Sequence, residues 1–326
     1  MHFGTLNGKD VTKVELSKGD ISCSILDYGC TIHSLEVPDR DGNPVDVVLG
    51  YDTIDQYATL PGRMGATIGR FANRIAGGKL PISVTVHQLS INRPPNHIHG
   101  GNIGFDKRIW EISEERSDRA VFSLVSEDGD EGYPGRMETS VEFQLGVGEL
   151  TRILSISYSA ISDKDTVWNL TNHSYFNLAG EGTIDGHEVL LNTYKWLPVD
   201  KEGIPFGYLE DASEHTGKPV VLGAEDRYDT CFILERGDAH AWCASKKTGI
   251  GMTVITDMPA LQLYTGDGLR DTVGKGGKPI GKRSGICFET EFPPDSPNNR
   301  YGKLCVLEAG KRRTLHTTFR FISFGR

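Results

Sequence analysis

The chain has 326 residues, and its 35 Lys and Arg against 44 Asp and Glu give a formal net charge of −9. An acidic surface repels nucleic-acid phosphates and anionic lipid headgroups, which disfavours binding through a basic stripe and favours a small neutral partner. No apolar run approaches the ~20 residues of a membrane helix, and the start of the chain has no signal-peptide pattern. We therefore expect no nucleic-acid and no membrane partner.

The cysteines indicate a reducing compartment. Among the six there is no C-x-x-C pair and no clustered spacing, which excludes zinc-finger, thioredoxin-like and compact disulfide-rich frameworks. Reduced thiols are typical of the cytosol, so we expect a cytoplasmic protein.

Short alternating segments along the whole chain predict an all-β protein. The clearest lie at residues 21–25, 137–145, 154–160 and 315–321. Apolar and polar residues alternate in them with period two, which buries one face of each strand. The 39 glycines fall between such segments, as in chains with many turns. The turn residues of Pro38–Pro44 predict a hairpin between its two neighbouring apolar segments.

The composition gives no sign of a domain boundary. We find no linker-like stretch, internal repeat or low-complexity run, and large β-sandwiches can exceed 200 residues, so we expect one domain over residues 1–326. Scattered Gly and Pro predict a loop-rich surface at Val199–Tyr228. Gly274–Pro279 is glycine-rich but lacks the residue order of a phosphate-binding loop, so it predicts a solvated turn.

Two polar segments in the first third of the chain could bind a ligand. Gly69–Ile75 offers two guanidinium groups and an amide, which suit hydrogen bonding to hydroxyls or carboxylates. Asn96–Gly101 contains His97 and His99, whose rings would point the same way on an extended strand. They could form half of a metal site, or they could be structural histidines beside a glycine turn. Because no H-E-x-x-H motif or third ligand is apparent, we expect no metal.

Titratable residues in the second half of the chain could catalyse proton transfer. In Thr171–Asn177, His173 lies among polar and aromatic residues, as a ligand-binding or a core histidine would. Glu289 and Glu291 are two residues apart in a strand-like segment, so both project from one face. Neighbouring carboxylates raise the pKa of at least one partner, as suits a general base. The alternative is an exposed strand end with two solvated glutamates.

Five motifs, in this order, resemble those of aldose 1-epimerases, the galactose mutarotases. They are Gly69–Ile75, Asn96–Gly101 with Gly104–Lys107, Asn169–Leu178, Gln262–Gly266 and Cys287–Thr290, reinforced by Asp128–Gly135. The resemblance spans nearly the whole chain. It implies a large antiparallel β supersandwich with a sugar-binding cleft on one face, and an activity that needs neither metal nor cofactor.

The same resemblance assigns roles to individual residues. Glu289 matches the general base of the family, and His173 matches its general acid. The positions that match sugar-contacting residues are Asn73, Arg74, His99, Asp229 and Gln262. His97 matches no such position. The implied substrates are free aldohexoses such as galactose and glucose, and we expect a monomer or a weak dimer.

The chain departs from the family pattern in three places. Many members have His where Thr230 stands and Gln where Glu291 stands, and the segment 202–227 is shorter and divergent. These departures concern substrate identity and pH dependence, because the catalytic pair is intact. If Glu291 faces Glu289, replacing it by Gln is expected to move the acidic limb of activity to lower pH.

The chemistry implied needs one base and one acid. A cyclic hemiacetal opens when a base removes the C1 hydroxyl proton while an acid protonates the ring oxygen, and reclosure on the other face inverts C1. Two alternatives remain. A noncatalytic carbohydrate-binding module would use the same cleft without turnover, and a glycosidase needs two carboxylates that flank the scissile bond.

Overall fold

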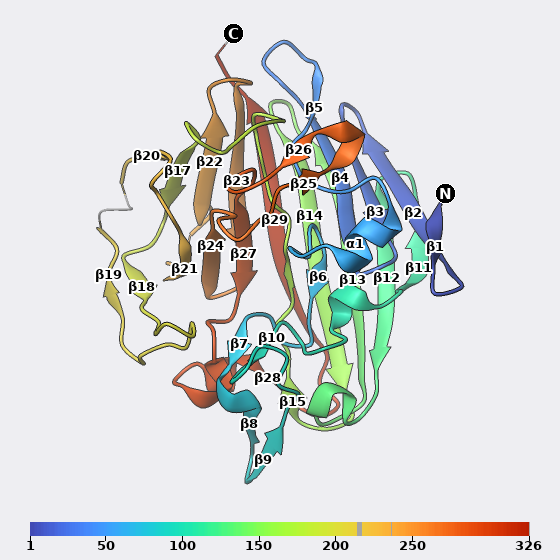
Figure 1. Ribbon diagram of the computed structural model, residues 1–326, viewed down its shortest axis with the longest axis vertical. Coiled ribbons are helices and arrows are strands. Elements are labelled where there is room, and N and C mark those ends of the chain that lie inside the picture. Colours follow the sequence, from blue (N-terminus) through green and yellow to red (C-terminus); the bar gives the residue numbers. More distant parts are fainter. Residues whose placement is uncertain (214–216, 236, 326) are drawn as a thin grey trace.

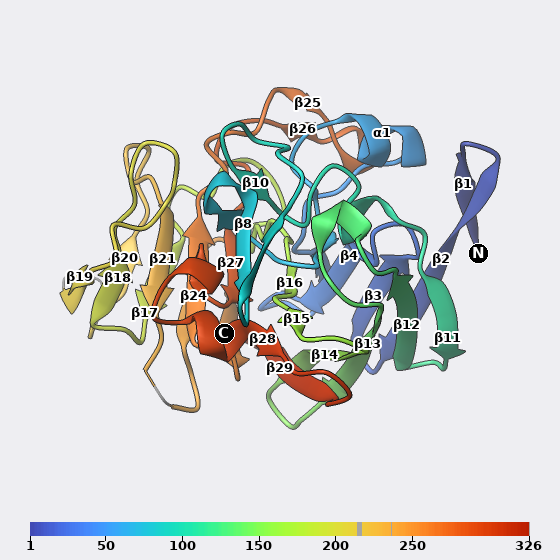
Figure 2. The same ribbon diagram turned by 90° about the horizontal axis from the view of Figure 1, so that it is seen from below.

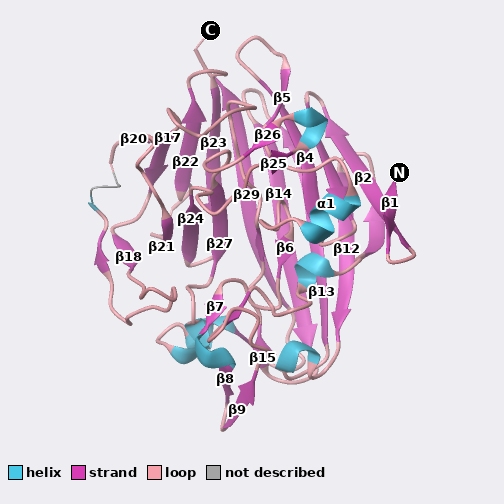
Figure 3. Ribbon diagram, in the orientation of Figure 1, coloured by secondary structure: helices cyan, strands magenta, loops and turns pink. Residues whose placement is uncertain are grey.

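The computed structural model describes residues 1–213, 217–235 and 237–325, and strands dominate it (Figure 3). Its largest element is a nine-stranded antiparallel sheet that runs along the molecule (Figure 1). In sheet order the strands are β11 (Glu111–Glu115), β12 (Arg119–Ser126), β13 (Met137–Val147), β14 (Arg152–Ser162), β29 (Arg313–Ser323), β23 (Ile250–Thr256), β22 (Ala241–Ser245), β17 (Glu188–Leu191) and β20 (Val220–Val221).

Two five-stranded antiparallel sheets accompany the nine-stranded sheet. The first contains β1 (His2–Leu6), β2 (Lys9–Lys18), β3 (Ile21–Leu26), β4 (Thr31–Pro38) and β5 (Pro44–Asp46). The second contains β19 (Glu210–Asp211), β18 (Lys195–Leu197), β21 (Asp229–Ile233), β24 (Ala260–Tyr264) and β27 (Cys287–Glu291). Strands β2 and β3 contact β13. The ring of Phe176 lies 6.3 Å from Phe288 on β27 and 5.0 Å from Phe319 on β29, so apolar side chains fill the space between the sheets.

Short strand pairs and a few short helices complete the chain. The pairs are β6 (Thr67–Ile68) with β16 (Thr171–Asn172), β7 (Arg74–Ile75) with β10 (His97–Ile98), β8 (Lys79–Ile82) with β9 (Thr85–Gln88), β15 (Thr166–Val167) with β28 (Val306–Leu307), and β25 (Thr272–Val273) with β26 (Pro279–Ile280). The α-helices are α1 (Ile54–Thr59) and α2 (Gly302–Cys305), and single 3₁₀ turns occur at Ala76–Gly78, Phe105–Lys107, Asp130–Gly132, Lys275–Gly277 and Ser296–Asn298. Seen from below, α1, β25 and β26 lie on the side opposite β14 and β29 (Figure 2).

The all-β prediction is confirmed, because the alternation decides which residues are buried. In β14, the apolar residues from Leu154 to Ala160 are buried and the serines between them are not. The predicted hairpin forms where Pro38 of β4 pairs with Pro44 of β5. In the described part of the segment 199–228, the only strands are the two-residue β19 and β20, and the rest is mostly loop and turn, as its composition predicted. Within the described residues, no helix is long and apolar enough to cross a membrane.

Candidate active site

One face of the second five-stranded sheet collects polar side chains from three neighbouring strands. Gln262 on β24 pairs with Glu289 on β27 and with Cys231 on β21. Paired residues and residues two apart on a strand share a face, so Asp229 and Glu291 lie on this face too. The alternate residues of these strands pack into the hydrophobic core. The sheet therefore gives the site a rigid floor.

A short strand brings His173 to this floor. The backbone of His173 continues the pairing of β16 with β6, since its N–H donates to the carbonyl oxygen of Ala66 (2.9 Å) and its own carbonyl accepts from the N–H of Gly65 (3.0 Å). Strand β16 packs against β27. As a result, Nε2 of His173 lies 3.7 Å from Oε2 of Glu289, and both side chains are buried.

Three side chains surround the imidazole ring of His173. Tyr175 stacks on it with ring centroids 5.1 Å apart and an interplanar angle of 30°. The ring of His99 meets it edge-on at 5.7 Å. The Sγ atom of Cys287 lies 3.5 Å from Nδ1. The two nitrogens of His173 therefore face different groups, Nε2 the carboxyl of Glu289 and Nδ1 the thiol.

A chain of amides and carboxyls crosses the site from the interior to the surface. Oε1 of Glu291 accepts a hydrogen bond from Nδ2 of Asn73 (2.8 Å), which also lies 3.4 Å from Oε1 of Gln262. Nε2 of Gln262 donates to Oδ1 of Asp229 (2.7 Å). Glu291 is fully buried, whereas Asp229 is exposed. This arrangement offers several hydrogen-bonding groups that suit a ligand with more than one hydroxyl.

Asn73 and His99 hold each other in place. The N–H of His99 donates to the carbonyl oxygen of Asn73 (3.1 Å), and the N–H of Asn73 donates to Nδ1 of His99 (3.2 Å). Both residues are in the left-handed region, with φ of 63° and 51°. Asn and His adopt this conformation more readily than most residues. Gly100 follows with φ of 79°, and a Cβ there would lie 1.7 Å from the carbonyl oxygen of Gly69, so this turn requires glycine.

The left-handed conformation of His99 makes one sequence expectation wrong. The rings of His97 and His99 do not point the same way, because the chain is not extended at His99. His97 is fully buried, with Nδ1 2.8 Å from the carbonyl oxygen of Ser90 and Nε2 2.6 Å from the hydroxyl of Tyr133. It is a structural histidine.

The two arginines of Gly69–Ile75 have different surroundings. Arg70 is buried and donates to the carbonyl oxygens of Ser126, Pro134 and Gly135, so it fixes a loop and does not reach the site. Arg74 is half-buried, and its N–H donates to Oδ1 of Asn73 (2.9 Å).

Arg74 also marks where the divergent segment 202–227 meets the site. A Cβ on Gly203 would lie 2.6 Å from Cζ of Arg74. The backbone of Gly203 therefore rests against the guanidinium group, and Gly203 itself has φ of 77°. A larger residue at this position would displace the arginine. The divergent segment consequently contributes to the wall of the site.

Burial raises the pKa of both glutamates on β27. For Glu289 the pKa lies well above the ordinary value, because the carboxyl is desolvated and because Glu291 and Asp229 add negative charge. For Glu291, desolvation raises the pKa to about 8, although the hydrogen bond from Asn73 opposes this rise. Glu289 is 3% exposed and Glu291 is 0% exposed. The alternative of two solvated glutamates at a strand end is therefore wrong.

Burial lowers the pKa of the two histidines of the site. Desolvation and then the charge of Arg63 lower the pKa of His173 to about 3, and they lower that of His99 well below its ordinary value. Arg63 donates from Nε to Oδ2 of Asp106 (3.0 Å). Arg63 could not be singled out from the sequence, because it belongs to no motif and comes near the site only through the fold.

Two carboxyl oxygens of the site are buried without a hydrogen-bond partner in the described chain: Oε2 of Glu289 and Oε2 of Glu291. Buried polar atoms are normally paired, so these oxygens are suited to bind a ligand. Among the described residues, His173, Cys287 and Glu289 also bring metal-type ligand atoms within 4.8 Å of one another. This group includes both residues predicted to transfer protons.

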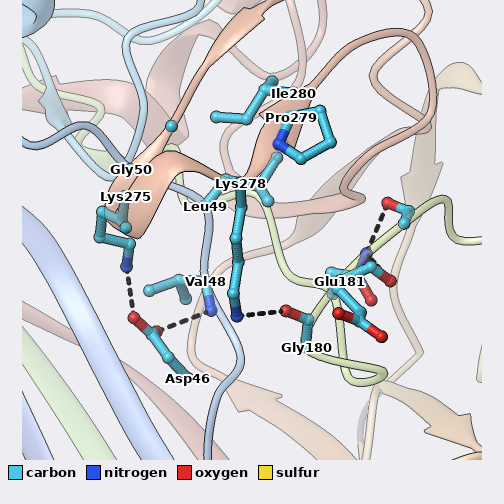
Figure 4. Close-up of a pocket in the computed structure, with 14 residues that line it drawn as sticks. Asp46, Val48, Leu49, Gly50, Gly180, Glu181, Lys275, Lys278, Pro279 and Ile280 are labelled. Atoms are coloured by element: carbon cyan, nitrogen blue, oxygen red, sulfur yellow. Dashed lines mark hydrogen bonds and ion pairs between the residues drawn. The ribbon is translucent and has the colours of Figure 1, made fainter.

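A separate cavity of about 230 Å³ lies beside β26 (Figure 4). None of the predicted site residues lines it. One wall is the segment Gly274–Pro279, for which the sequence predicted a solvated turn. This prediction is wrong for Lys275, because its side chain is mostly buried and its Nζ donates to Oδ2 of Asp46 and to the carbonyl oxygen of His33, both at 2.6 Å.

Comparison with known proteins agrees with this site. The family model described as aldose 1-epimerase matches residues 12–320. Galactose mutarotase of Mus musculus is 39% identical over 336 aligned positions, which cover 98% of this chain and 97% of the relative. Aldose 1-epimerase of Escherichia coli (strain K12) is 35% identical, with 92% of each chain covered.

Solved structures show the same architecture. An aldose epimerase homologue from C. elegans superimposes with a TM-score of 0.91 at 25% identity, covering 97% of this chain and 100% of that one. A galactose 1-epimerase from Lactobacillus acidophilus gives a TM-score of 0.87 at 27% identity, covering 100% and 98%. The predicted β supersandwich of the galactose mutarotase type is thereby confirmed. The chain belongs to the aldose 1-epimerase family.

Proposed function

We propose that the protein interconverts the α and β anomers of free aldohexoses such as galactose and glucose. The observation that carries this proposal is the buried pair of Glu289 and His173, whose reactive atoms lie 3.7 Å apart. Such a pair can remove one proton and supply another within the length of a hemiacetal group. The names of the relatives in mouse, Escherichia coli and Lactobacillus acidophilus support the same activity.

The proposed reaction needs Glu289 as a carboxylate and His173 as an imidazolium. Burial favours the uncharged forms of both, so one proton must move from Glu289 to Nε2 of His173, which leaves the net charge of the site unchanged. The raised pKa makes the carboxylate of Glu289 a strong base, and the lowered pKa makes the imidazolium of His173 a strong acid.

Ring opening then transfers two protons. Glu289 takes the proton of the C1 hydroxyl, the C1–ring oxygen bond breaks, and the ring oxygen takes a proton from Nε2 of His173. The open aldehyde rotates about C1–C2, and reclosure on the other face reverses both transfers. We assign sugar binding to Asn73, Arg74, His99, Asp229 and Gln262, whose amide, guanidinium, imidazole and carboxylate groups suit sugar hydroxyls.

Polarimetry tests the proposed activity. Freshly dissolved α-D-glucose, α-D-galactose and a pentose should each reach rotational equilibrium at the uncatalysed rate without protein, and the two hexoses faster with it. Unchanged rates for all three sugars at micromolar protein would contradict the proposed activity and favour a noncatalytic sugar-binding module.

The glycosidase alternative has weaker support in the structure. Such an enzyme needs two carboxyls on opposite sides of the scissile bond, whereas Glu289 and Glu291 project from the same face of β27. Incubation with nitrophenyl glycosides distinguishes the two activities, since a mutarotase releases no nitrophenol.

We expect the activity to be independent of metal ions. The proposed acid and base are both organic groups, so dialysis against EDTA should leave the mutarotation rate unchanged. The rate with and without chelator, measured by polarimetry, checks this. Loss of activity in EDTA, with recovery on adding a divalent ion, would show instead that the cluster of His173, Cys287 and Glu289 holds a functional metal.

Alanine substitutions should separate the two neighbouring histidines. His99→Ala removes a ring beside His173 and should lower kcat/KM by about 10-fold. His97→Ala should leave the activity of the folded protein unchanged but lower the free energy of unfolding by roughly 1–3 kcal/mol, because the hydroxyl of Tyr133 loses its buried partner. Polarimetry and urea denaturation measure the two effects, and equal losses of activity would contradict the assignment.

Several wider features remain proposals. We propose that residues 1–326 form one domain, which the shared hydrophobic core supports, and that the protein is cytoplasmic, which its six unpaired buried cysteines support. The net charge of −9 supports a neutral monosaccharide as partner, with no nucleic acid and no membrane. A monomer or a weak dimer is proposed for the oligomeric state.

A further inference from the structure

The imidazole of His173 lies between a carboxyl and a thiol. Its Nε2 is 3.7 Å from Oε2 of Glu289, and its Nδ1 is 3.5 Å from Sγ of Cys287. Cys287 and Glu289 are two residues apart on β27 and share one face of that strand. Cys287 is fully buried, so the thiol contacts the ring and does not reach solvent.

We propose that Cys287 is a positioning residue whose sulfur accepts a hydrogen bond from Nδ1–H of His173, so that Nδ1 keeps its proton and Nε2 alone exchanges a proton with the sugar. This inference rests on the proposed function, because it describes how the acid of that reaction is oriented.

The geometry supports this tautomer. A neutral imidazole carries one proton, on either Nδ1 or Nε2. Nε2 faces the carboxyl of Glu289, from which the proposed reaction must deliver a proton to the ring, so Nε2 has to be the unprotonated nitrogen in the resting pair. The single proton of the ring then lies on Nδ1, and Sγ of Cys287 is in position to accept it. The same bond persists when Nε2 gains its proton, so the ring does not need to turn during the cycle.

A thiol suits this position better than a carboxylate would. Burial and the neighbouring carboxyls of Glu289 and Asp229 raise the pKa of the Cys287 thiol, so the sulfur stays uncharged. A neutral sulfur is a weak acceptor that orients the ring without stabilising the imidazolium. An anionic partner at Nδ1 would raise the pKa of His173 and weaken it as an acid. The thiol therefore fixes the orientation of the ring and keeps the imidazolium a strong acid.

Nitrogen-15 NMR of the histidine-labelled protein tests the tautomer directly. The signals of His173 are identified by their loss in His173→Asn. At neutral pH and without sugar, the shifts of the two ring nitrogens should show the proton on Nδ1. A proton on Nε2 would overturn the proposal. The NMR measurement does not depend on turnover. If the protein failed to accelerate mutarotation, the proposed function would be refuted, but the NMR shifts would still show which nitrogen of His173 carries the proton.

Kinetics of three variants test the consequence. Cys287→Ala removes the acceptor and should lower kcat by about 10-fold with KM within twofold of wild type, whereas Cys287→Ser keeps an acceptor and should stay within about threefold in kcat. Cys243→Ala is the matched control, because Cys243 is also fully buried but lies on β22 of the nine-stranded sheet. A wild-type kcat in folded Cys287→Ala would show that the thiol only fills space. If Cys287→Ala does not fold, the NMR result and the Cys287→Ser variant decide. The proposal would be contradicted if the His173 proton lay on Nε2 in Cys287→Ser while kcat stayed unchanged.

Discussion

Glu289→Gln and His173→Asn are each expected to lower kcat for mutarotation by about 10²-fold or more, with the larger loss for Glu289→Gln. Gln fills nearly the same volume as Glu but cannot accept a proton, and Asn cannot donate one. Because the two residues act on the same hemiacetal, removal of either leaves one proton transfer uncatalysed. The rates are measured by polarimetry or by a coupled assay at substrate saturation.

Two conservative changes away from the site serve as controls. Glu138→Gln removes a largely exposed carboxylate on β13, and His316→Asn removes an exposed imidazole on β29. Both should keep wild-type kcat. Near-normal turnover in folded Glu289→Gln or His173→Asn would refute the assignment of the catalytic pair, and far-UV circular dichroism distinguishes this outcome from unfolding.

The sequence predicts the parts of this molecule that local rules control. Alternation of apolar residues decides which side of β14 is buried, and turn residues place the hairpin between β4 and β5. The positions on β27 are predictable for the same reason, since a period of two puts Glu289 and Glu291 on one face whatever the strand pairs with.

The surroundings of the site depend on contacts between distant segments, which single-sequence patterns do not encode. Arg63 belongs to no motif, yet its charge influences both Glu289 and His173. Cys287 belongs to the motif Cys287–Thr290, but its contact with His173 arises only when β16 packs against β27.

Backbone conformation accounts for the histidine prediction that was wrong. The assumption of an extended chain at Asn96–Gly101 is natural for a short segment between turns. The left-handed φ of 51° at His99 sends its ring to Asn73, while His97 turns to Tyr133. The following Gly100 and Gly101 signal a turn, but they do not show that the turn begins one residue earlier.

Glu291→Gln is expected to move the basic limb of the kcat/KM profile to lower pH by about one unit. The pKa of Glu291 is about 8, so this carboxyl is uncharged on the acidic limb of the profile. Replacing it by Gln should therefore change kcat/KM little at acidic pH. From the sequence alone, the substitution is expected to move the acidic limb. Because Glu291 is uncharged at acidic pH in the folded chain, we now expect the basic limb to move instead. Above about pH 8 the ionised Glu291 raises the pKa of Glu289, which keeps the proton on the catalytic pair to higher pH. Gln removes that charge and retains an oxygen that accepts the hydrogen bond from Asn73.

The basic limbs of the kcat/KM profiles of wild type and Glu291→Gln decide this prediction. Superimposable basic limbs would mean that Glu291 does not influence the pKa of Glu289.

The same substitution should change how stability depends on pH. The pKa of Glu291 is raised from its ordinary value of 4.5 to about 8 in the folded chain, so between these values the unfolded chain binds fewer protons and the wild type loses stability as pH rises. Each unit of pKa is worth about 1.4 kcal/mol, so this rise makes the wild type less stable at pH 8 than near pH 4.5. Because Gln does not ionise, the variant should match the wild type near pH 4.5 and exceed it in free energy of unfolding by several kcal/mol at pH 8. Urea denaturation at both pH values measures the difference, and a gap that does not grow with pH would show that Glu291 ionises in the fold as readily as in water.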